Sequence, residues 1–392
     1  MRVLMFGWEF PPHIAGGLGT ACKGIVEGLA HNGVQTLFVM PSASGDEDQS
    51  CTEIINASDV AVQHVSSSVD EFIDKVKFVY VDSNLVPYVE PDEYFEAIEK
   101  MKKEMVTQTT IGFGQKFKFS GKYGANLMEE VSRYAQVGGT IAMQHNDEFD
   151  VIHAHDWLTY LAGIAAKELT GKPLVVHVHA TSFDRGTDDM VDSRVYAIEK
   201  RGMEMADKVV AVSELTRNIV INKYGIDPSK VVAVHNAVDF SGREDLTVER
   251  GVKDKVVTFL GRITYQKGPE YFIDAAAKVL KRTKGVRFVM AGSGDMMNRS
   301  IRQVARLGIS DRFHFTGFLR GKEVQEMFAL SDVYVMPSVS EPFGISPLEA
   351  MRTGVPSVIS KQSGAAEVLK YAFKVDFWDV DAMADEIYAL LK

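Results

Sequence analysis

Short runs of apolar residues alternate along the chain with longer segments in which apolar residues recur every three or four positions. The short runs are rich in β-branched residues and are bounded by turn residues, which is typical of strands in parallel sheets covered on both faces. The longer segments have the periodicity of amphipathic helices. This alternation predicts an α/β protein built from βαβ units.

The pattern runs through the chain twice. In the first part, a helix at 17–32 follows the first predicted strand, and the strands expected are 3–6, 36–40, 78–81, 151–154, 174–178, 209–212 and 231–234. The alternation begins again after residue 240. The strands expected there lie near 256–260, 287–291, 312–316, 333–336, 357–359 and 373–376, and a final helix covers 380–392.

The repeated pattern predicts two Rossmann-like domains, 1–240 and 255–392, joined by a polar linker at 241–254. A chain of 392 residues agrees with this division, because domains usually contain about 100–200 residues. Residues 41–125 are more polar than the rest of the first domain. We interpret them as an insertion that includes a charged helix near 91–105.

Composition and charge exclude several classes of partner. A net charge of −10 without a basic block disfavours nucleic acid. The two cysteines, Cys22 and Cys51, provide no disulfide framework and no zinc-ligand pattern, so the expected compartment is the cytoplasm. We expect no transmembrane segment, because no apolar run reaches the roughly 18 residues that span a bilayer. Contact with a membrane surface and the oligomeric state stay open.

Two motifs in the first part follow predicted strands. The glycines of G-G-L-G at 16–19 would let backbone N–H groups approach an anion at a helix N-terminus, although a turn that needs small residues fits equally well. The second motif, H-A-H-D-W at 153–157, ends a strand, where ligands bind in open α/β sheets.

Four histidines lie at two of these strand ends. His153 and His155 point to one face of their strand, as two zinc ligands could, but no third ligand with a fitting spacing is evident and we expect no metal. His177 and His179 repeat the pattern on the next strand. Each histidine alone is typical of a packed residue. Four together favour an edge that faces a cleft.

Two cations follow the first strand of the second domain, in G-R-I-T-Y-Q-K-G at 261–268. Arg262 and Lys267 could hold a diphosphate and stabilise the charge that develops as it leaves. The alternative is a pair of exposed cations on a loop. A further glycine turn, A-G-S-G-D at 291–295, could donate backbone N–H groups or could simply cap the next helix.

Two carboxylates lie eight positions apart in S-V-S-E-P-F-G-I-S-P-L-E-A at 338–350. Pro347 suits the first turn of a helix, which places Glu349 near its start and Glu341 on the preceding loop. Both could accept hydrogen bonds from vicinal sugar hydroxyls. The alternative is that Glu341 is solvated and that Glu349 only interacts with the helix dipole, and for Glu349 alone this alternative is favoured. With the two cations upstream, the two carboxylates predict a nucleotide-sugar site.

Taken in order, these motifs resemble the retaining glycosyltransferases of the family that includes glycogen and starch synthases, sucrose-phosphate synthases and mannosyltransferases. The motifs that carry the resemblance are the glycine loop at 16–19, H-A-H-D-W at 153–157, V-H-A at 178–180, G-R-x4-K-G at 261–268 and E-x7-E at 341–349. The segments W-E-F-P-P-x3-G-G-L-G and D-V-I-H-A-H-D-W are similar to the glycogen-synthase-like branch.

The resemblance implies the GT-B fold, in which two Rossmann-like domains face each other across a cleft, and a reaction that needs neither metal nor cofactor. It implies four catalytic residues. Arg262 and Lys267 would bind the diphosphate of the donor and help it leave, Glu341 would contact the donor sugar, and His179 would lie near that sugar.

The resemblance also implies a donor-binding set in which Gly16 and Gly17 lie near the phosphates and Glu349 holds the ribose. Gly292 and Gly344 complete this set. His155 and Asp156 are candidates for the cleft and the acceptor side.

The implied activity is retaining α-glycosyl transfer, with glucose moved from UDP- or ADP-glucose to a glucan. The alternatives are α-glycosyl or mannosyl transfer to a small-molecule or lipid acceptor, a UDP-sugar epimerase and a non-catalytic binding module. Ile14 and Ala15 stand where many bacterial starch synthases carry a lysine, so the ADP-glucose preference of those enzymes does not carry over. Family members usually continue past the final helix, so the second domain either closes at Lys392 or is truncated there.

Overall fold

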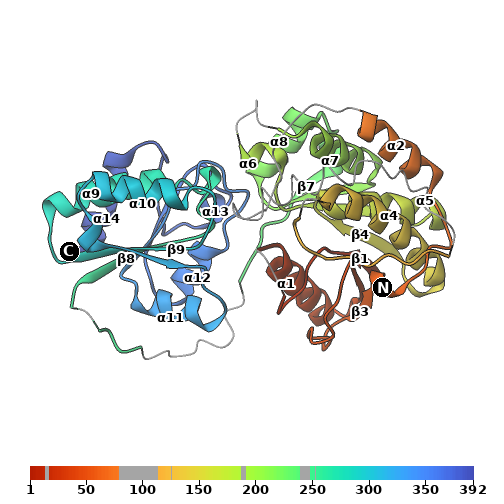
Figure 1. Cartoon of the computed structure of the whole chain (residues 1–392), viewed down its shortest axis with the longest axis horizontal. Coiled ribbons are helices and arrows are strands. Elements are labelled where there is room, and N and C mark those ends of the chain that lie inside the picture. The colour runs from red at the N-terminus through yellow and green to blue at the C-terminus, as the bar shows by residue number, and fades with distance from the viewer. Residues whose placement is uncertain (14–16, 79–113, 125, 187–190, 239–247, 252) are drawn as a thin grey trace. The chain divides into compact units, whose positions relative to one another are not determined.

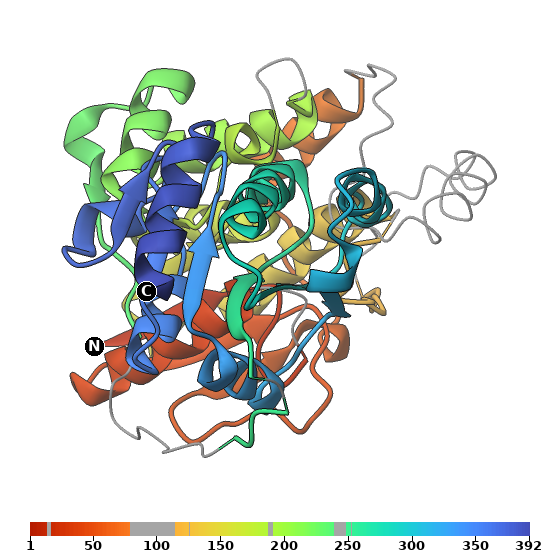
Figure 2. The same cartoon turned by 90° about the vertical axis from the view of Figure 1, so that its left-hand side faces the viewer.

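The computed structural model describes residues 1–13, 17–78, 114–124, 126–186, 191–238, 248–251 and 253–392. The chain forms two compact units. The first comprises Met1–Phe183, Asp188–Val212 and Thr216–Val234, and the second comprises Asp184–Thr187, Ser213–Leu215 and His235–Lys392. Each unit contains one parallel sheet with helices on both faces (Figures 1 and 2).

The sheet of the first unit has the strand order β3-β2-β1-β4-β5-β6-β7. Its strands are β1 (Arg2–Phe6), β2 (Gln35–Met40), β3 (Glu53–Asn56), β4 (Val151–His155), β5 (Leu174–Val178), β6 (Lys208–Ala211) and β7 (Val231–Ala233). The helices are α1 (Gly17–His31), α2 (Ser67–Phe78), α4 (Leu127–Gln144), α5 (Trp157–Thr170), α6 (Ser182–Arg185), α7 (Ser193–Met205) and α8 (Glu214–Tyr224).

The core of the first unit lies where α4 and α5 pack on the sheet. Close packing requires a small residue at Gly138, because an added Cβ would lie 2.9 Å from the Cβ of Ala162. The buried Tyr134 of α4 donates its hydroxyl hydrogen bond to the carbonyl oxygens of Val39 and Gly7, at 2.8 and 3.1 Å. This contact fixes the helix against the carboxyl ends of the central strands.

The sheet of the second unit has the strand order β10-β9-β8-β11-β12-β13. Its strands are β8 (Lys255–Leu260), β9 (Val286–Ala291), β10 (Phe313–Gly317), β11 (Val333–Met336), β12 (Ser357–Ser360) and β13 (Phe373–Val375). The helices α9 (Pro269–Arg282), α10 (Met297–Arg306) and α14 (Val380–Leu391) contribute to the core on one face. The helices α11 (Lys322–Leu330), α12 (Ser346–Arg352) and α13 (Ala365–Val368) contribute to the core on the other (Figure 1).

The predicted α/β class with parallel sheets is confirmed, as are the strands of the second unit. The prediction of a strand at 78–81 is wrong for its first residue, Phe78. Phe78 ends α2, because apolar residues recur at helical spacing from Val69 onward. Residues 79–81 and the helix expected near 91–105 lie outside the described residues. The strand β3 lies within the segment interpreted as an insertion and was not predicted.

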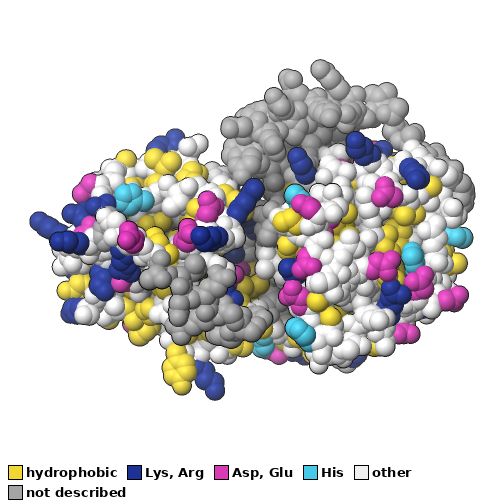
Figure 3. Space-filling model, turned by 90° about the horizontal axis from the view of Figure 1, so that it is seen from below, with side chains coloured by type: hydrophobic (Ala, Val, Ile, Leu, Met, Phe, Trp, Pro, Cys, Tyr) yellow, Lys and Arg dark blue, Asp and Glu magenta, His cyan; other side chains and the backbone are white. Residues whose placement is uncertain are grey.

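The linker expected at 241–254 stays a prediction, because 239–247 lies outside the described part of the chain. None of the helices in the described residues is long and apolar enough to cross a lipid bilayer. Acidic and basic side chains are interspersed on the faces that Figure 3 shows.

Candidate functional site

The residues singled out from the sequence follow strands at the carboxyl edge of each sheet. In the first unit they follow β1, β4 and β5, and in the second unit they follow β8, β9 and β11. All strands of a parallel sheet end at the same edge, and ligands of open α/β proteins bind there.

In the second unit, Lys267 and Glu341 form an ion pair. Lys267 Nζ lies 2.5 Å from Glu341 Oε2, and the side chains are 21% and 8% exposed. Ser338 Oγ donates a second hydrogen bond to the same carboxylate oxygen at 3.2 Å. The cation expected to bind phosphate is therefore held beside the carboxylate expected to contact the sugar.

Backbone contacts position the loop that carries Arg262. The N–H groups of Gly261 and Ile263 donate to the carbonyl oxygens of Ala291 and Ser293, at 3.0 and 2.7 Å. Gly292 has a φ of 141°, and a Cβ on it would lie 1.9 Å from the carbonyl oxygen of Gly261. Only glycine fits this approach of the β8 and β9 loops.

Arg262 Nη2 donates a hydrogen bond to Gln266 Oε1 at 3.2 Å. The carbonyl oxygen of Gln266 in turn accepts from Val339 N at 2.9 Å. Gly268, with a φ of 64°, completes this junction, because an added Cβ would lie 2.2 Å from the carbonyl oxygen of Pro337. The structure thus packs the loop with both cations directly against the loop that leads to Glu341.

The backbone of Glu341 is held on both sides. Its N–H group donates to the carbonyl oxygen of Gln362 at 2.9 Å, and its carbonyl oxygen accepts from Gly364 N at 3.0 Å. Gly344 turns the chain toward α12 with a φ of 92°, and a Cβ there would lie 3.1 Å from Glu341 Cγ. This close approach gives the glycine a role in shaping the carboxylate loop.

Glu349 lies in the first turn of α12 and is half-buried. Burial raises the pKa of its carboxyl group, and the nearby Arg352 partly opposes that shift. Glu349 and Glu341 both influence the hydroxyl group of Tyr334, whose pKa is raised chiefly by burial and further by these two carboxylates. Both glutamates therefore lie close enough to the same buried hydroxyl to interact with it electrostatically.

Tyr334 connects two of the loops and was not predicted as a site residue. Its hydroxyl group donates to the carbonyl oxygen of Leu260, 3.3 Å away at the end of β8, and lies 2.7 Å from Ser346 Oγ at the start of α12. In the sequence it stands in the apolar run V-Y-V-M, which indicated only a buried strand. Gln266 and Ser338 were also missed, and no sequence signal distinguishes them.

In the first unit, the four histidines form one cluster at the carboxyl ends of β4 and β5. Strand register pairs His155 with His177, and their ring centroids are 5.2 Å apart. The ring of His153 lies 4.2 Å from that of His155, and the ring of His179 lies 4.3 Å from that of His177. The nitrogens His155 Nδ1 and His179 Nε2 are 2.9 Å apart and share a hydrogen bond.

Burial keeps all four rings neutral at neutral pH. It lowers the pKa of His153 to about 4 and that of His179 to about 3, and the neighbouring His153 adds to the lowering of the His179 pKa. The pKa values of His155 and His177 are also well below the ordinary value, first because of burial and then because of the other rings. The cluster therefore offers lone pairs and N–H groups rather than positive charge.

Asp156 holds the backbone next to His179. It is buried, and Oδ1 accepts from His179 N at 2.7 Å and from Ala180 N at 3.3 Å. Its backbone has a φ of 58° and a ψ of 169°, a combination that is essentially confined to glycine. We expected Asp156 in a cleft or on the acceptor side, and the structure shows it as a buried support for the loop after β5.

The glycine loop is only partly described, since Gly16 lies outside the described residues. Gly17 begins α1, is exposed, and a Cβ on it would meet nothing within 4 Å. Packing therefore does not explain this glycine. The buried Glu9 accepts a hydrogen bond from Gly19 N at 3.1 Å, so a carboxylate missed in the sequence already lies at this end of α1.

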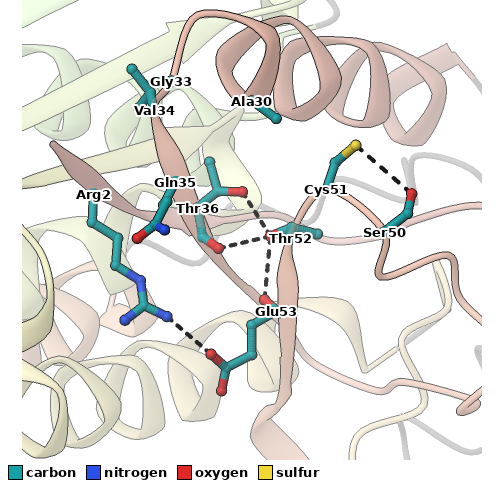
Figure 4. A pocket seen from close by; sticks show the side chains of 10 residues that line it. All are labelled: Arg2, Ala30, Gly33, Val34, Gln35, Thr36, Ser50, Cys51, Thr52 and Glu53. Carbon is teal, nitrogen blue, oxygen red and sulfur yellow. Dashed lines mark hydrogen bonds and ion pairs between the residues drawn. The ribbon is translucent and has the colours of Figure 1, made fainter.

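A pocket of about 640 Å³ lies at the other edge of the first sheet (Figure 4). It is lined by Arg2, Gln35 and Glu53, which begin or directly flank the amino-terminal ends of β1, β2 and β3. Figure 4 shows the ion pair between Arg2 and Glu53 among the lining residues. Because this pocket is at the amino ends of the strands, we do not assign it to the site described above.

Two family profiles match the chain, one in each of its two parts. The family profile described as Glycosyltransferase Family 4 matches residues 125–241, and that described as Glycosyl transferases group 1 matches residues 244–392. The chain is 29% identical over 385 residues to the uncharacterized glycosyltransferase MJ1607 of Methanocaldococcus jannaschii, covering 95% of this chain and 83% of that protein. It is 25% identical over 377 residues to glycogen synthase from Mycobacterium tuberculosis, covering 94% and 80%.

A solved structure has the same fold. The crystal structure of Anabaena Alr3699/HepE in complex with UDP and glucose matches with a TM-score of 0.67 at 17% identity, covering 100% of this chain and 90% of that one. The three comparisons agree on the class of protein: two glycosyltransferase family profiles match, two glycosyltransferase relatives match along nearly the whole chain, and the fold is shared with a solved structure. The chain belongs to the GT-B glycosyltransferases of the glycogen synthase-like group.

Proposed function

We propose that the protein transfers glucose from UDP- or ADP-glucose to the end of a glucan and retains the α configuration. The observation that carries this proposal is the group of two cations and two carboxylates that follow β8 and β11. Arg262 and Lys267 follow β8, Glu341 lies in the loop after β11, and Glu349 lies in the first turn of α12. The Lys267–Glu341 ion pair joins the two loops directly.

The two cations would bind the diphosphate of the donor. When the sugar–phosphate bond breaks, negative charge grows on the leaving diphosphate, and fixed cations stabilise that charge without reorganising. Lys267 is held by Glu341, and the Arg262 loop is held by the β9 loop, so both positions are set before a donor arrives. We propose that the transfer step needs no metal, because these side chains supply the positive charge.

The two carboxylates would bind hydroxyl groups at the two ends of the donor. Glu341 lies beside the phosphate-binding Lys267, which favours contact with the sugar next to the diphosphate. Glu349, at the start of α12, would accept hydrogen bonds from the ribose hydroxyls. Gly292 and Gly344 shape the loops around these residues, as their close contacts require.

In the first unit, we propose that Gly16 and Gly17 contribute backbone N–H groups and that His179 hydrogen-bonds the donor sugar. Asp156 fixes the backbone of His179, and His155 shares a hydrogen bond with its ring. Because the ring is neutral, it can donate from one nitrogen and accept at the other. Through these contacts His155 and Asp156 would support His179 rather than bind the acceptor.

Similarity to the glycogen synthase of Mycobacterium tuberculosis over 94% of this chain supports a glucan acceptor. The test is a screen in which UDP-glucose, ADP-glucose and GDP-mannose are each combined with glycogen, a sugar phosphate and a lipid acceptor. Product configuration is read by NMR. We expect an α-linked glucan from UDP- or ADP-glucose.

Three results would change the proposal. A β-linked product would overturn retention, and transfer only to the sugar phosphate or lipid would replace the glucan acceptor. Conversion of the donor to its epimer without an acceptor would indicate an epimerase. A matched control separates chemistry from folding: Lys281→Ala, an exposed lysine in the last turn of α9, should leave transfer unchanged, whereas Lys267→Ala should abolish most of it.

A further inference from the structure

The histidine cluster contains a feature that glycosyl transfer does not use. Three of its rings, His153, His155 and His177, come from two adjacent strands and present nitrogens that all lie within 4.8 Å of one another. The register of β4 and β5 places His155 opposite His177, and His153 lies two residues earlier on the same face. This convergence depends on strand pairing between residues that are far apart in the sequence.

Nitrogens in the same three rings lack hydrogen-bond partners. Within the described part of the chain, His153 Nε2, His155 Nε2 and both ring nitrogens of His177 are buried and make no hydrogen bond. Leaving a buried polar group unpaired costs about 1–3 kcal/mol, so several such groups in one place indicate that something binds them. The exposed fractions of His155 and His177 are 0% and 5%.

We propose that His153, His155 and His177 bind a divalent transition-metal ion of the zinc type. Neutral imidazole nitrogens are preferred ligands of zinc, and three histidines leave a fourth position for water. Zinc–nitrogen bonds of about 2.0–2.1 Å place the nitrogens of a tetrahedral site about 3.3 Å apart. The three nitrogens are already within 4.8 Å of one another, and the ring of His177, which stacks on those of His153 and His155, would have to rotate to point its lone pair at a shared ion.

A competing set of ligands shares one histidine with this one. Cys22, His155 and His179 also offer ligand atoms within 4.8 Å of one another. In that set, however, His155 Nδ1 and His179 Nε2 already share a hydrogen bond of 2.9 Å. Burial, and then the charges of Glu9 and Asp156, raises the pKa of the Cys22 thiol, which disfavours the thiolate that binds metal. We therefore assign the three-histidine set.

Metal at this site would also fix the proton on His179. If His155 Nε2 binds the ion, His155 Nδ1 must carry the proton of the neutral ring and donate it to His179 Nε2. His179 then carries its own proton on Nδ1. The ion would thus orient His179, the histidine proposed to contact the sugar, although the ion itself would not touch the donor. This structural role is separate from the transfer step proposed above, which needs no metal.

The test uses the full chain without a polyhistidine tag, stripped with a chelator and then titrated with Co²⁺. Bound metal is measured by mass spectrometry and by visible absorption. We expect one ion per chain, with the absorption of a four-coordinate site and no sulfur-to-cobalt charge-transfer band. Because His153 is only half-buried, His153→Gln should fold, and we expect it to weaken binding about 100-fold or more.

The exposed His31, in the last turn of α1, provides the matched control, and His31→Gln should bind as the wild type does. Equal binding by the wild type and His153→Gln would overturn the proposal, as would a wild type that retains no metal after dialysis. A sulfur charge-transfer band that disappears in Cys22→Ser would assign the ion to the other ligand set.

Discussion

Lys267 and Glu341 are 74 residues apart in the sequence, yet Lys267 Nζ lies 2.5 Å from Glu341 Oε2. Both side chains are largely buried, and the pair joins the loop after β8 to the loop after β11. The cation that we propose to bind a diphosphate is thus already positioned by a carboxylate. This contact has separate consequences for activity and for stability.

For activity, we predict that Lys267→Ala lowers kcat about 10²–10³-fold. Loss of one preorganised group that stabilises developing charge typically has an effect of this size. The measurement is steady-state transfer with saturating donor, beside Lys281→Ala as the matched control. A kcat within twofold of the wild type would show that Lys267 does not face the leaving group.

For stability, we predict that the two residues are coupled. Lys267→Met leaves a buried carboxylate without its cation, and Glu341→Gln leaves the cation with a neutral partner, so each change should destabilise the fold. The double variant should lose less than the sum of the two. We expect a coupling free energy of about 1–3 kcal/mol, measured by urea denaturation of all four proteins. Additive effects would mean that the pair contributes nothing.

Gly292 tests whether the backbone of the β9 loop positions Arg262. Its φ of 141° and a contact of 1.9 Å between an added Cβ and the Gly261 carbonyl oxygen make alanine incompatible with this loop. We predict that Gly292→Ala destabilises the fold by about 2 kcal/mol or more and raises the KM for the donor. Gly285→Ala is the control, because a Cβ there meets nothing within 4 Å. Equal stability of the two variants would refute the argument.

Much of the fold and of the second-unit site followed from local sequence. Strands appeared as apolar runs, and the positions of Arg262, Lys267 and Glu341 after such runs placed them at one sheet edge. The strand β3 was missed because E-I-I-N contains only two apolar residues. The strand expected at 78–81 was wrong at Phe78, because aromatic and β-branched residues suit a strand, whereas this residue continues the helix that precedes it.

What could not be predicted depends on contacts between distant segments. The third histidine near His153 and His155 was not evident from spacing, because His177 reaches them through the pairing of β4 with β5. The role of Tyr334 requires two loops to meet at its hydroxyl group. The backbone conformation of Asp156 has no sequence signature at all, since the residue type does not favour it.

Glu349 gives a pH dependence with a defined direction. Burial raises the pKa of this carboxyl group above its ordinary value of 4.5, and the proposed contact with ribose hydroxyls uses the ionised form. We therefore predict that affinity for UDP-glucose falls as the pH falls through the raised pKa. Calorimetric titration over that range should show a decrease that Glu349→Gln lacks. The exposed Glu249→Gln should keep the wild-type profile.

The raised pKa of Glu349 affects the stability of the fold in the opposite direction: donor affinity falls at low pH, whereas stability falls at high pH. A carboxyl group whose pKa is raised by folding stabilises the fold fully below its unfolded pKa, and this contribution is lost as the pH rises through the folded value. At neutral pH the ionised Glu349 is therefore a cost. We predict that Glu349→Gln is at least as stable as the wild type at pH 7 while it binds donor more weakly. A variant that loses stability at pH 7 would contradict this assignment.

At Asp156, the hydrogen bonds made by the carboxylate and the strain of the backbone can be tested separately. Its carboxylate accepts hydrogen bonds from the N–H groups of His179 and Ala180, and its φ of 58° with a ψ of 169° costs about 1–3 kcal/mol in any residue except glycine. Asp156→Gly removes the acceptor but also relieves the strain. We therefore predict little change in its unfolding free energy, since losing a buried acceptor costs a similar amount.

Activity should respond differently, because His179 depends on that acceptor for its position. We predict that Asp156→Gly lowers kcat at least tenfold with little change in the KM for the donor, whereas Asp156→Asn, which keeps an acceptor oxygen, retains most of the activity. Thermal unfolding and steady-state kinetics on the two variants measure both effects. If Asp156→Gly keeps the wild-type kcat, the loop after β5 does not need this carboxylate to place His179.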